Sequence, residues 1–344
     1  MTRAGVLTVA VVLLGCAGGA AAPTASSNAS RTLQAIRARG VVRCGITAGA
    51  GFAVPDDAGQ WQGFDVDFCR AIAVALFNDP TKAEEIPYTQ QQRFAGLQSG
   101  EVDVLANGTS LTISRVMQQP FHFGPVYFYD GQGFMVPKAS KVTRAAQLDG
   151  ATICVQQGTT TELNLADFGR RTHITLRPLV LEDLRGAVSA LASGRCDAIS
   201  QDGAGLATTR ATLGDSSAYV ILPDRISKEP IAPLVRDGDD RWLEIVNWVF
   251  RAPIEAEELG LSRQNVAQFD SSSDPAVRRF LGIDPGATNG YGLDPRWTEH
   301  VIAAVGNYGD IFDRHLGPKT PLHMERGLNR LWTNGGLLYS PPFR

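Results

Sequence analysis

Two matching segments limit the folds that this chain can adopt. The first reads LQSGEVD at residues 97–103, and the second reads LASGRCD at residues 191–197. Each is typical of a helix end, a glycine that adopts a left-handed conformation at little cost, and a following strand. The chain therefore contains one α/β unit twice, and polar residues come directly after the strand in both copies.

Those polar residues predict a binding site, because ligands of open α/β sheets bind beyond the carboxyl ends of the strands. Arg115 follows the first strand, and its guanidinium matches a carboxylate bidentately. Asp202 follows the second strand and can accept hydrogen bonds from an ammonium group. Two such units face to face predict a cleft for a small zwitterion. The alternatives are that Arg115 is a surface residue capping a helix and that Asp202 is the N-cap of a helix over 203–213.

Further candidates stand in the same segments. Ser110 and Thr112 add hydroxyl groups beside Arg115. The run QQGTTTE at 156–162 follows a strand and opens a helix, where free N–H groups attract anions. It contributes Gln156, Thr159 and Thr160, although Thr159 to Glu162 also matches a capping box. Phe52, Trp61 and Phe94 are candidates for stacking on a ligand, and each is also typical of a core residue. Asp65 and Asp67 are expected to cap a helix.

The order of predicted elements gives an α/β fold of two lobes. A βαβαβ order implies mostly parallel sheets. The β-like run at 126–136 leaves one lobe, and 231–235 returns to it. We expect lobe 1 at 31–134 and 236–344, with a helical C-terminal extension, and lobe 2 at 135–235. The paired crossings, near 133–136 and 231–235, predict a two-strand hinge with a ligand cleft between the lobes. Pro253 is expected to kink or break a helix over 241–258.

The N-terminus is typical of an exported protein. Residues 1–22 match a signal peptide, and 23–30 form a small-residue linker. Leu13 to Cys16 also resembles a lipobox, which leaves open a lipid anchor on Cys16. Later in the chain no apolar run is long enough to span a bilayer.

Because disulfides persist in oxidising compartments, export predicts that the four remaining cysteines form disulfides. Four cysteines allow three pairings. We favour Cys44–Cys69 and Cys154–Cys196, since each bridge then stays inside one α/β unit, and buried free thiols are the alternative. No metal-ligand spacing is present, so no metal is predicted. The net charge of −3 and the absence of a basic stripe argue against nucleic acid as a partner.

Several motifs of the chain match those of a known family. They are GFDVDFCRA (63–71), RFAGLQSG (93–100), YDGQGFMV (129–136), GTTTELN (158–164), ISKEP (226–230) and GNYG (306–309). The chain resembles the periplasmic solute-binding proteins of polar amino-acid ABC transporters, and within them the general L-amino-acid-binding subgroup. The resemblance implies the type II periplasmic binding protein fold. It assigns the carboxylate of the ligand to Arg115, the ammonium to Asp202, and supporting contacts to Ser110, Thr112, Thr159 and Thr160.

The resulting expectation is a periplasmic component of an importer. It would capture polar L-amino acids over a broad range and deliver them to an inner-membrane permease, without a cofactor and without catalysis. Two alternatives remain on the same scaffold. One is a ligand sensor that docks on a receptor, and the other is a periplasmic enzyme such as a dehydratase, which would need a general acid or base at the reacting carbon.

Overall fold

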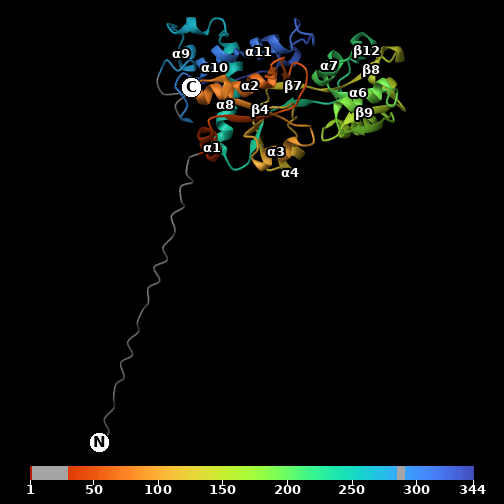
Figure 1. Ribbon diagram of the computed structural model, residues 1–344, viewed down its shortest axis with the longest axis horizontal. Helices are drawn as coiled ribbons and strands as arrows, with labels where there is room; N and C mark the ends of the chain where they lie inside the picture. The colour runs from red at the N-terminus through yellow and green to blue at the C-terminus, as the bar shows by residue number, and fades with distance from the viewer. Residues whose placement is uncertain (2–29, 285–290) are drawn as a thin grey trace.

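The protein is described here by a computed structural model, which covers Met1, residues 30–284 and residues 291–344. The predicted signal peptide, Cys16 and residues 23–29 of the predicted linker lie outside the described residues. Two five-stranded sheets form the centres of two lobes, which stand side by side in Figure 1. No helix among the described residues has the length and apolar character needed to cross a membrane.

Lobe 1 is built on a sheet with the strand order β4-β1-β5-β14-β6. β1 is parallel to both β4 and β5, whereas β14 is antiparallel to β5 and β6. The strands are β1 (Val42–Ile46), β4 (Ala83–Pro87), β5 (Val104–Leu105), β6 (Phe121–Phe123) and β14 (Leu234–Arg236). The first four helices of the chain, which also belong to lobe 1, are α1 (Arg31–Arg39), α2 (Phe64–Phe77), α3 (Arg93–Ser99) and α4 (Ile113–Gln118). A short hairpin in this lobe pairs β2 (Val54–Pro55) with β3 (Trp61–Gln62).

Lobe 2 repeats this arrangement with the strand order β10-β9-β11-β8-β12. β9 is parallel to β10 and β11, and β8 is antiparallel to β11 and β12. The strands are β8 (Gln132–Pro137), β9 (Thr152–Gln156), β10 (Arg177–Leu181), β11 (Ala198–Asp202) and β12 (Tyr219–Ile221). The helices are α5 (Thr161–Thr172), α6 (Leu184–Ala192) and α7 (Gly203–Ala211).

The duplicated α/β unit predicted from the two matching segments is confirmed. The series β1-α2-β4-α3-β5 in lobe 1 corresponds element by element to β9-α5-β10-α6-β11 in lobe 2. Helix α3 ends at Gly100 with φ of 82°, and Gly194 follows α6 with φ of 72°. The left-handed backbone at both glycines turns the chain from each helix into the strand that carries site residues at its end.

A two-stranded antiparallel ribbon connects the lobes. It pairs β7 (Phe128–Asp130) with β13 (Glu229–Ile231). The predicted class of two α/β lobes joined by a two-strand hinge is therefore confirmed, but the crossings come earlier in the chain than expected. Residues 133–136 lie in β8, inside the sheet of lobe 2, because the run at 126–136 is divided into two strands at Gly131. The return crossing is at Glu229–Ile231, and Leu234 already pairs in lobe 1.

The C-terminal extension packs on lobe 1, where it lies over α2 in Figure 1. It contains α8 (Asp240–Glu258), α9 (Pro275–Phe280), α10 (Trp297–Val305) and α11 (Tyr308–His315), followed by a tail of turns and loops that continues to Arg344. The expected break at Pro253 does not occur, since α8 continues to Glu258. Val249, Phe250 and Pro253 itself are buried, so packing on the core holds the helix together despite the missing backbone donor.

Candidate functional site

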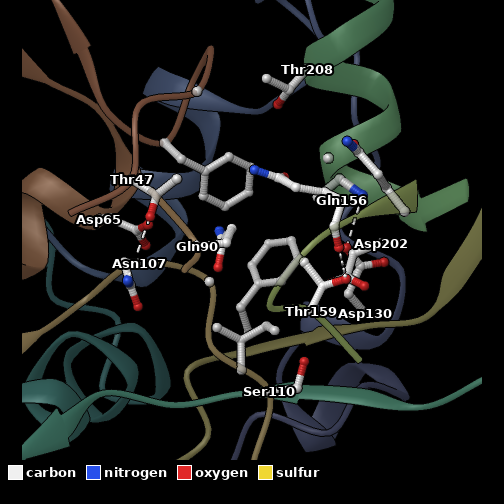
Figure 2. Close-up of a pocket in the computed structure, with 18 of the residues that line it drawn as sticks. Thr47, Asp65, Gln90, Asn107, Ser110, Asp130, Gln156, Thr159, Asp202 and Thr208 are labelled. Atoms are coloured by element: carbon white, nitrogen blue, oxygen red, sulfur yellow. Dashed lines mark hydrogen bonds between the residues drawn. The ribbon is translucent and has the colours of Figure 1, made fainter. Parts of the chain in front are cut away.

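A cavity of about 200 Å³ lies between the lobes and is lined by residues of both. Seven of the eight residues predicted to bind ligand line it: Phe52, Ser110, Arg115, Gln156, Thr159, Thr160 and Asp202. Figure 2 shows Asp202 and Thr159 on the lobe 2 side, facing Thr47 and Asn107 of lobe 1. The matching strand ends therefore meet as the duplication predicted.

Thr112 is the exception among the predicted ligand contacts. It is not one of the cavity-lining residues; its hydroxyl accepts a hydrogen bond from the Arg115 N–H at 3.3 Å. Thr112 is thus the N-cap of α4. A hydroxyl at the start of a helix satisfies a backbone N–H there, and this local role accounts for the absence of Thr112 from the cavity wall.

Arg115 stands in the first turn of α4 and faces the cavity. Its Nη1 donates to the Ser110 carbonyl at 2.7 Å, and the structure shows no other hydrogen bond of the guanidinium to a described residue. Burial lowers the pKa of Arg115, and the carboxylates of Glu229 and Asp202 oppose that shift. A desolvated guanidinium with unused donors is suited to an anionic ligand group.

A second arginine, Arg93, lines the same cavity and was not anticipated. It is 1% exposed, although it begins helix α3. Its Nε donates to Thr109 Oγ1 at 3.0 Å, its Nη1 donates to the Gln90 carbonyl, and its Nη2 reaches the Gly158 carbonyl of lobe 2 at 3.2 Å. Burial, and then the charge of Arg115, lowers the pKa of Arg93 to about 9.

The ring of Phe94 lies beneath both guanidinium groups. Its centroid is 4.4 Å from Cζ of Arg93 and 5.7 Å from Cζ of Arg115. The ring also stacks on Phe121 in the core of lobe 1. Phe94 therefore supports the two arginines by cation–π contact and does not itself line the cavity. Trp61 likewise packs against the core of lobe 1.

Asp202 and Asp130 divide two tasks at the end of β11. Asp130, from the hinge strand β7, accepts hydrogen bonds from the N–H groups of Gly131, Gly203 and Ala204 at 2.7, 3.1 and 2.8 Å. It thereby caps α7. Asp202 is the N-cap residue by position but makes no capping hydrogen bond with its side chain. The alternative role of Asp202 as a simple helix cap is therefore taken by Asp130.

The Asp202 carboxylate is held at an electrostatic cost. Burial raises its pKa well above the usual range, the charges of Asp130 and Glu229 raise it further, and Arg115 and Arg93 oppose the shift. No described residue hydrogen-bonds this carboxylate. An ammonium group that enters the cavity would offset the burial of the Asp202 carboxylate and its repulsion by Asp130 and Glu229, because it supplies an opposite charge and N–H donors.

The start of α5 completes the lobe 2 wall. The expected capping box of Thr159 with Glu162 does not form, because α5 begins one residue later, with Thr160 as its N-cap, and the Thr159 hydroxyl accepts from the Thr161 N–H at 3.3 Å instead. The Thr160 hydroxyl donates to Glu229 Oε2 at 3.1 Å, and Thr159 Oγ1 donates to the Gln156 carbonyl at 2.7 Å. Glu229 also accepts from Ser227 and Asn164. The helix start is thus fixed by contacts to the hinge strand β13, which orient its N–H groups for an anion.

One of the two predicted disulfides is confirmed. Cys154 of β9 is bonded to Cys196, which precedes β11, across a sequence separation of 42 residues. The pairing of Cys44 with Cys69 is wrong, because both are free thiols in this structure. They face each other between β1 and α2 in the apolar core, where a free cysteine packs as a small hydrophobe. Burial raises the pKa of both thiols, so they stay protonated.

No group of three or more potential metal ligands occurs among the residues that the structure describes. The lobes touch across the cleft through Thr208, whose Oγ1 donates to the Ala50 carbonyl at 3.0 Å, and through the contact of Arg93 with Gly158. The site therefore combines a guanidinium with unused donors on lobe 1, that of Arg115, with a carboxylate on lobe 2, that of Asp202, and both face one cavity.

Comparison with known proteins agrees with this geometry. The family model described as bacterial extracellular solute-binding proteins, family 3, matches residues 42–261. The general L-amino acid-binding periplasmic protein AapJ of Rhizobium johnstonii is 48% identical over 337 residues, which are 96% of this chain and 99% of the relative. The glutamate/glutamine/aspartate/asparagine-binding protein BztA of Rhodobacter capsulatus is 45% identical, over 94% of this chain and 96% of the relative.

A solved structure is similar over almost the whole described chain. It is an ABC transporter periplasmic binding protein from Brucella ovis with glutathione bound, 45% identical, with a TM-score of 0.89. The match covers 91% of this chain and 99% of that structure. The similarity thus includes the C-terminal extension, which continues beyond the residues of the family model.

Proposed function

Because the chain belongs to the bacterial extracellular solute-binding proteins of family 3, we propose that it captures L-amino acids between its lobes for an ABC importer. The observation that carries this proposal is the opposition of Arg115 and Asp202 across one cavity. Arg115 has unused donors for an α-carboxylate, and Asp202 has unused acceptors for an α-ammonium group. Every amino acid carries both groups, so these contacts recognise the class as a whole.

We infer a broad preference for polar L-amino acids. The wall beside the Arg115–Asp202 pair contains Gln90, Gln156 and Gln201, whose carboxamides can both donate and accept. Such side chains adapt to different ligands, directly or through water. The names of AapJ and BztA, which refer to several amino acids, support this inference.

Calorimetric titration with the twenty amino acids tests the proposal directly. We expect micromolar or tighter dissociation constants for several polar L-amino acids and much weaker binding of their D-enantiomers, which cannot place both α-groups and the side chain in the same way. Absence of binding across the panel would refute the function. Glutathione belongs in the same panel, because its γ-glutamyl end has a free α-carboxylate and α-ammonium and a structural relative holds glutathione.

Delivery implies a partner and a place outside the cytoplasm. We propose that the closed form docks on an inner-membrane permease, and that the ligand leaves unchanged. Incubation of the protein with each ligand that binds, followed by mass spectrometry of the ligand, tests whether the ligand leaves unchanged.

For Cys16 we propose a lipid anchor. The mass of the mature N-terminal peptide from membrane fractions would reveal it as a diacylglyceryl adduct.

A further inference from the structure

The lobe 1 wall of the cavity holds a second group of polar residues besides Arg115. Thr47, Asp65 and Asn107 form this group, and Figure 2 shows the three together, across the cavity from Asp202 and Asp130. Thr47 follows β1, Asn107 follows β5, and Asp65 lies in the first turn of α2. A ligand whose α-groups bind Arg115 and Asp202 would have this part of the cavity available for its side chain.

Asp65 has one oxygen committed and one uncommitted. Its Oδ1 accepts a hydrogen bond from the Tyr127 hydroxyl at 2.7 Å, and its Oδ2 makes no hydrogen bond to any residue in the described ranges. The residue is 2% exposed, so the cavity is its route to a further partner. Burial raises the pKa of Asp65 to about 7, and the Tyr127 hydroxyl opposes the shift by stabilising the carboxylate.

The other ionisable groups around Asp65 do not change their protonation state near pH 7. Burial raises the pKa of Tyr127 on the strand side, of Cys69 on α2 and of Tyr308 on α11 well above their usual values, so all three stay neutral. Asp67, two residues along α2, faces the other way. Although burial opposes it, contact with His315 and Arg314 lowers the pKa of Asp67, so that carboxylate stays ionised.

Arg93, Arg115, Asp130 and Asp202 line the same cavity and are further ionisable groups that a ligand meets. Asp202 contributes equally to every amino acid, because it faces the α-ammonium group. Its effect can therefore be removed by comparing ligands that differ only in their side chains. Any difference that remains between such ligands reports on the groups that meet the ligand side chain.

On the basis of the proposed function, we propose that this part of the cavity is the side-chain subsite and that Asp65 admits both carboxamide and carboxylate side chains by changing its own protonation. Ionised Asp65 accepts a hydrogen bond from the N–H of a glutamine or asparagine side chain. Protonated Asp65 donates its proton in a hydrogen bond to the carboxylate of glutamate or aspartate. The proton comes from solvent and returns to it when the ligand leaves.

This mechanism has a thermodynamic signature with a definite sign. Near pH 7 free Asp65 is present in both protonation states, because its pKa is about 7. Glutamate binding selects the protonated form, so it takes up a fraction of a proton. Glutamine binding selects the ionised form, so it releases a fraction of a proton. As a result the affinity ratio of glutamine to glutamate rises as the pH increases through 7.

Calorimetry at pH 7 in two buffers of different ionisation enthalpy measures these proton counts. L-Alanine, L-glutamine and L-glutamate are titrated, and the alanine value is subtracted to remove the contribution of Asp202. We expect opposite signs for glutamine and glutamate. Proton counts equal to that of alanine for both ligands would overturn the inference, whereas a failure of all three ligands to bind would instead refute the proposed function.

Three variants assign the effect to Asp65. Asp65→Asn cannot titrate, so both differences from alanine, measured on the same variant, should fall to zero. Tyr127→Phe removes a donor that stabilises the carboxylate, so the pKa of Asp65 rises, uptake with glutamate shrinks and release with glutamine grows. Asp67→Asn is the matched control outside the cavity and should keep the wild-type differences. Wild-type proton counts in Asp65→Asn would assign the titration to another group and overturn the inference.

Discussion

The side-chain carboxamide of Asn329 hydrogen-bonds both backbone groups of Tyr129 in the hinge. Asn329 Oδ1 accepts from the Tyr129 N–H at 2.6 Å, and Nδ2 donates to the Tyr129 carbonyl at 3.0 Å. The partner of Tyr129 in the ribbon is Pro230, which has no N–H. The missing N–H of Pro230 removes no hydrogen bond from the ribbon, because the backbone N–H and carbonyl of Tyr129 point away from Pro230, toward Asn329. The C-terminal extension thus completes the hinge strand, and Tyr308 adds a bond to the Tyr127 carbonyl at 2.9 Å.

Asn329→Ala should destabilise the protein by about 1–3 kcal/mol, since it leaves two backbone groups of a part-buried strand without partners. Asn329 is 5% exposed, so little water can replace it. Urea denaturation measures the loss. The control is Asn334→Ala, the same substitution at an exposed position in the same tail. Equal stability of the two variants would show that the contact contributes nothing.

Arg115→Lys should weaken amino-acid binding by about 2–5 kcal/mol without unfolding the protein. An ammonium group cannot reproduce the fork that a carboxylate requires. Titration with a ligand that binds wild type measures the change, and Arg185→Lys, at an exposed arginine outside the cavity, is the control. If Arg115→Lys binds within threefold of wild type, the carboxylate contact is made elsewhere, and Arg93 becomes the first candidate.

Asp202→Asn should weaken the binding of amino acids by about 2–5 kcal/mol and spare their deaminated analogues. It should also stabilise the empty protein at neutral pH. The pKa of Asp202 is raised on folding, so its ionised form destabilises the fold at pH values above the unfolded pKa, and the amide removes that penalty. Thermal unfolding with and without ligand measures both effects. Equal losses for both ligand types would remove Asp202 from the ammonium site.

Affinity for amino acids should also decline as the pH falls through the pKa of Asp202 in the empty site. The direction follows from its raised value, because protonation removes the charge that attracts the ammonium group. Titrations of alanine between pH 5 and 8 in wild type and Asp202→Asn test this. A flat profile in wild type would contradict it, and the variant should be flat because its amide does not titrate.

The double variant Cys154→Ser, Cys196→Ser should lose about 4 kcal/mol of stability, the value that the chain-entropy model gives for this loop. Both cysteines belong to lobe 2, so the loss should appear there first. Hydrogen exchange followed by mass spectrometry separates the lobes. Uniform acceleration of exchange in both lobes would contradict the assignment. In the wild type, Cys44 and Cys69 should react with alkylating reagents only after denaturation, because they are buried.

The sequence predicted the repeated unit and the Arg115–Asp202 pair because both depend on short, local patterns. The roles that it missed depend on tertiary contacts. Arg93 resembles a solvated residue in a helix, and its burial arises from Phe94 and from carbonyls as far along the chain as Gly158. Cap spacing alone could not tell that Asp130 would cap α7 in place of Asp202.

The same limit applies to the cysteines and to Asp65. The sequence spacing favoured Cys44–Cys69 and Cys154–Cys196 equally. Formation of a disulfide, however, depends on the distance and orientation of the two side chains in the folded protein. Asp65 and Asp67 share a motif and one turn of helix, so the pattern treats them alike. Only the fold directs Asp65 to the cavity and Asp67 to Arg314 and His315.

The cap that Asp130 provides has a consequence for the range of ligands. Asp130 belongs to the hinge strand and holds the first turn of α7, so the position of Asp202, the residue before that helix, is tied to the lobe 2 end of the ribbon. Bending of the ribbon would therefore change the separation of Asp202 from Arg115. Ligands of different length would be accommodated by different degrees of bending, with the walls of each lobe left as they are.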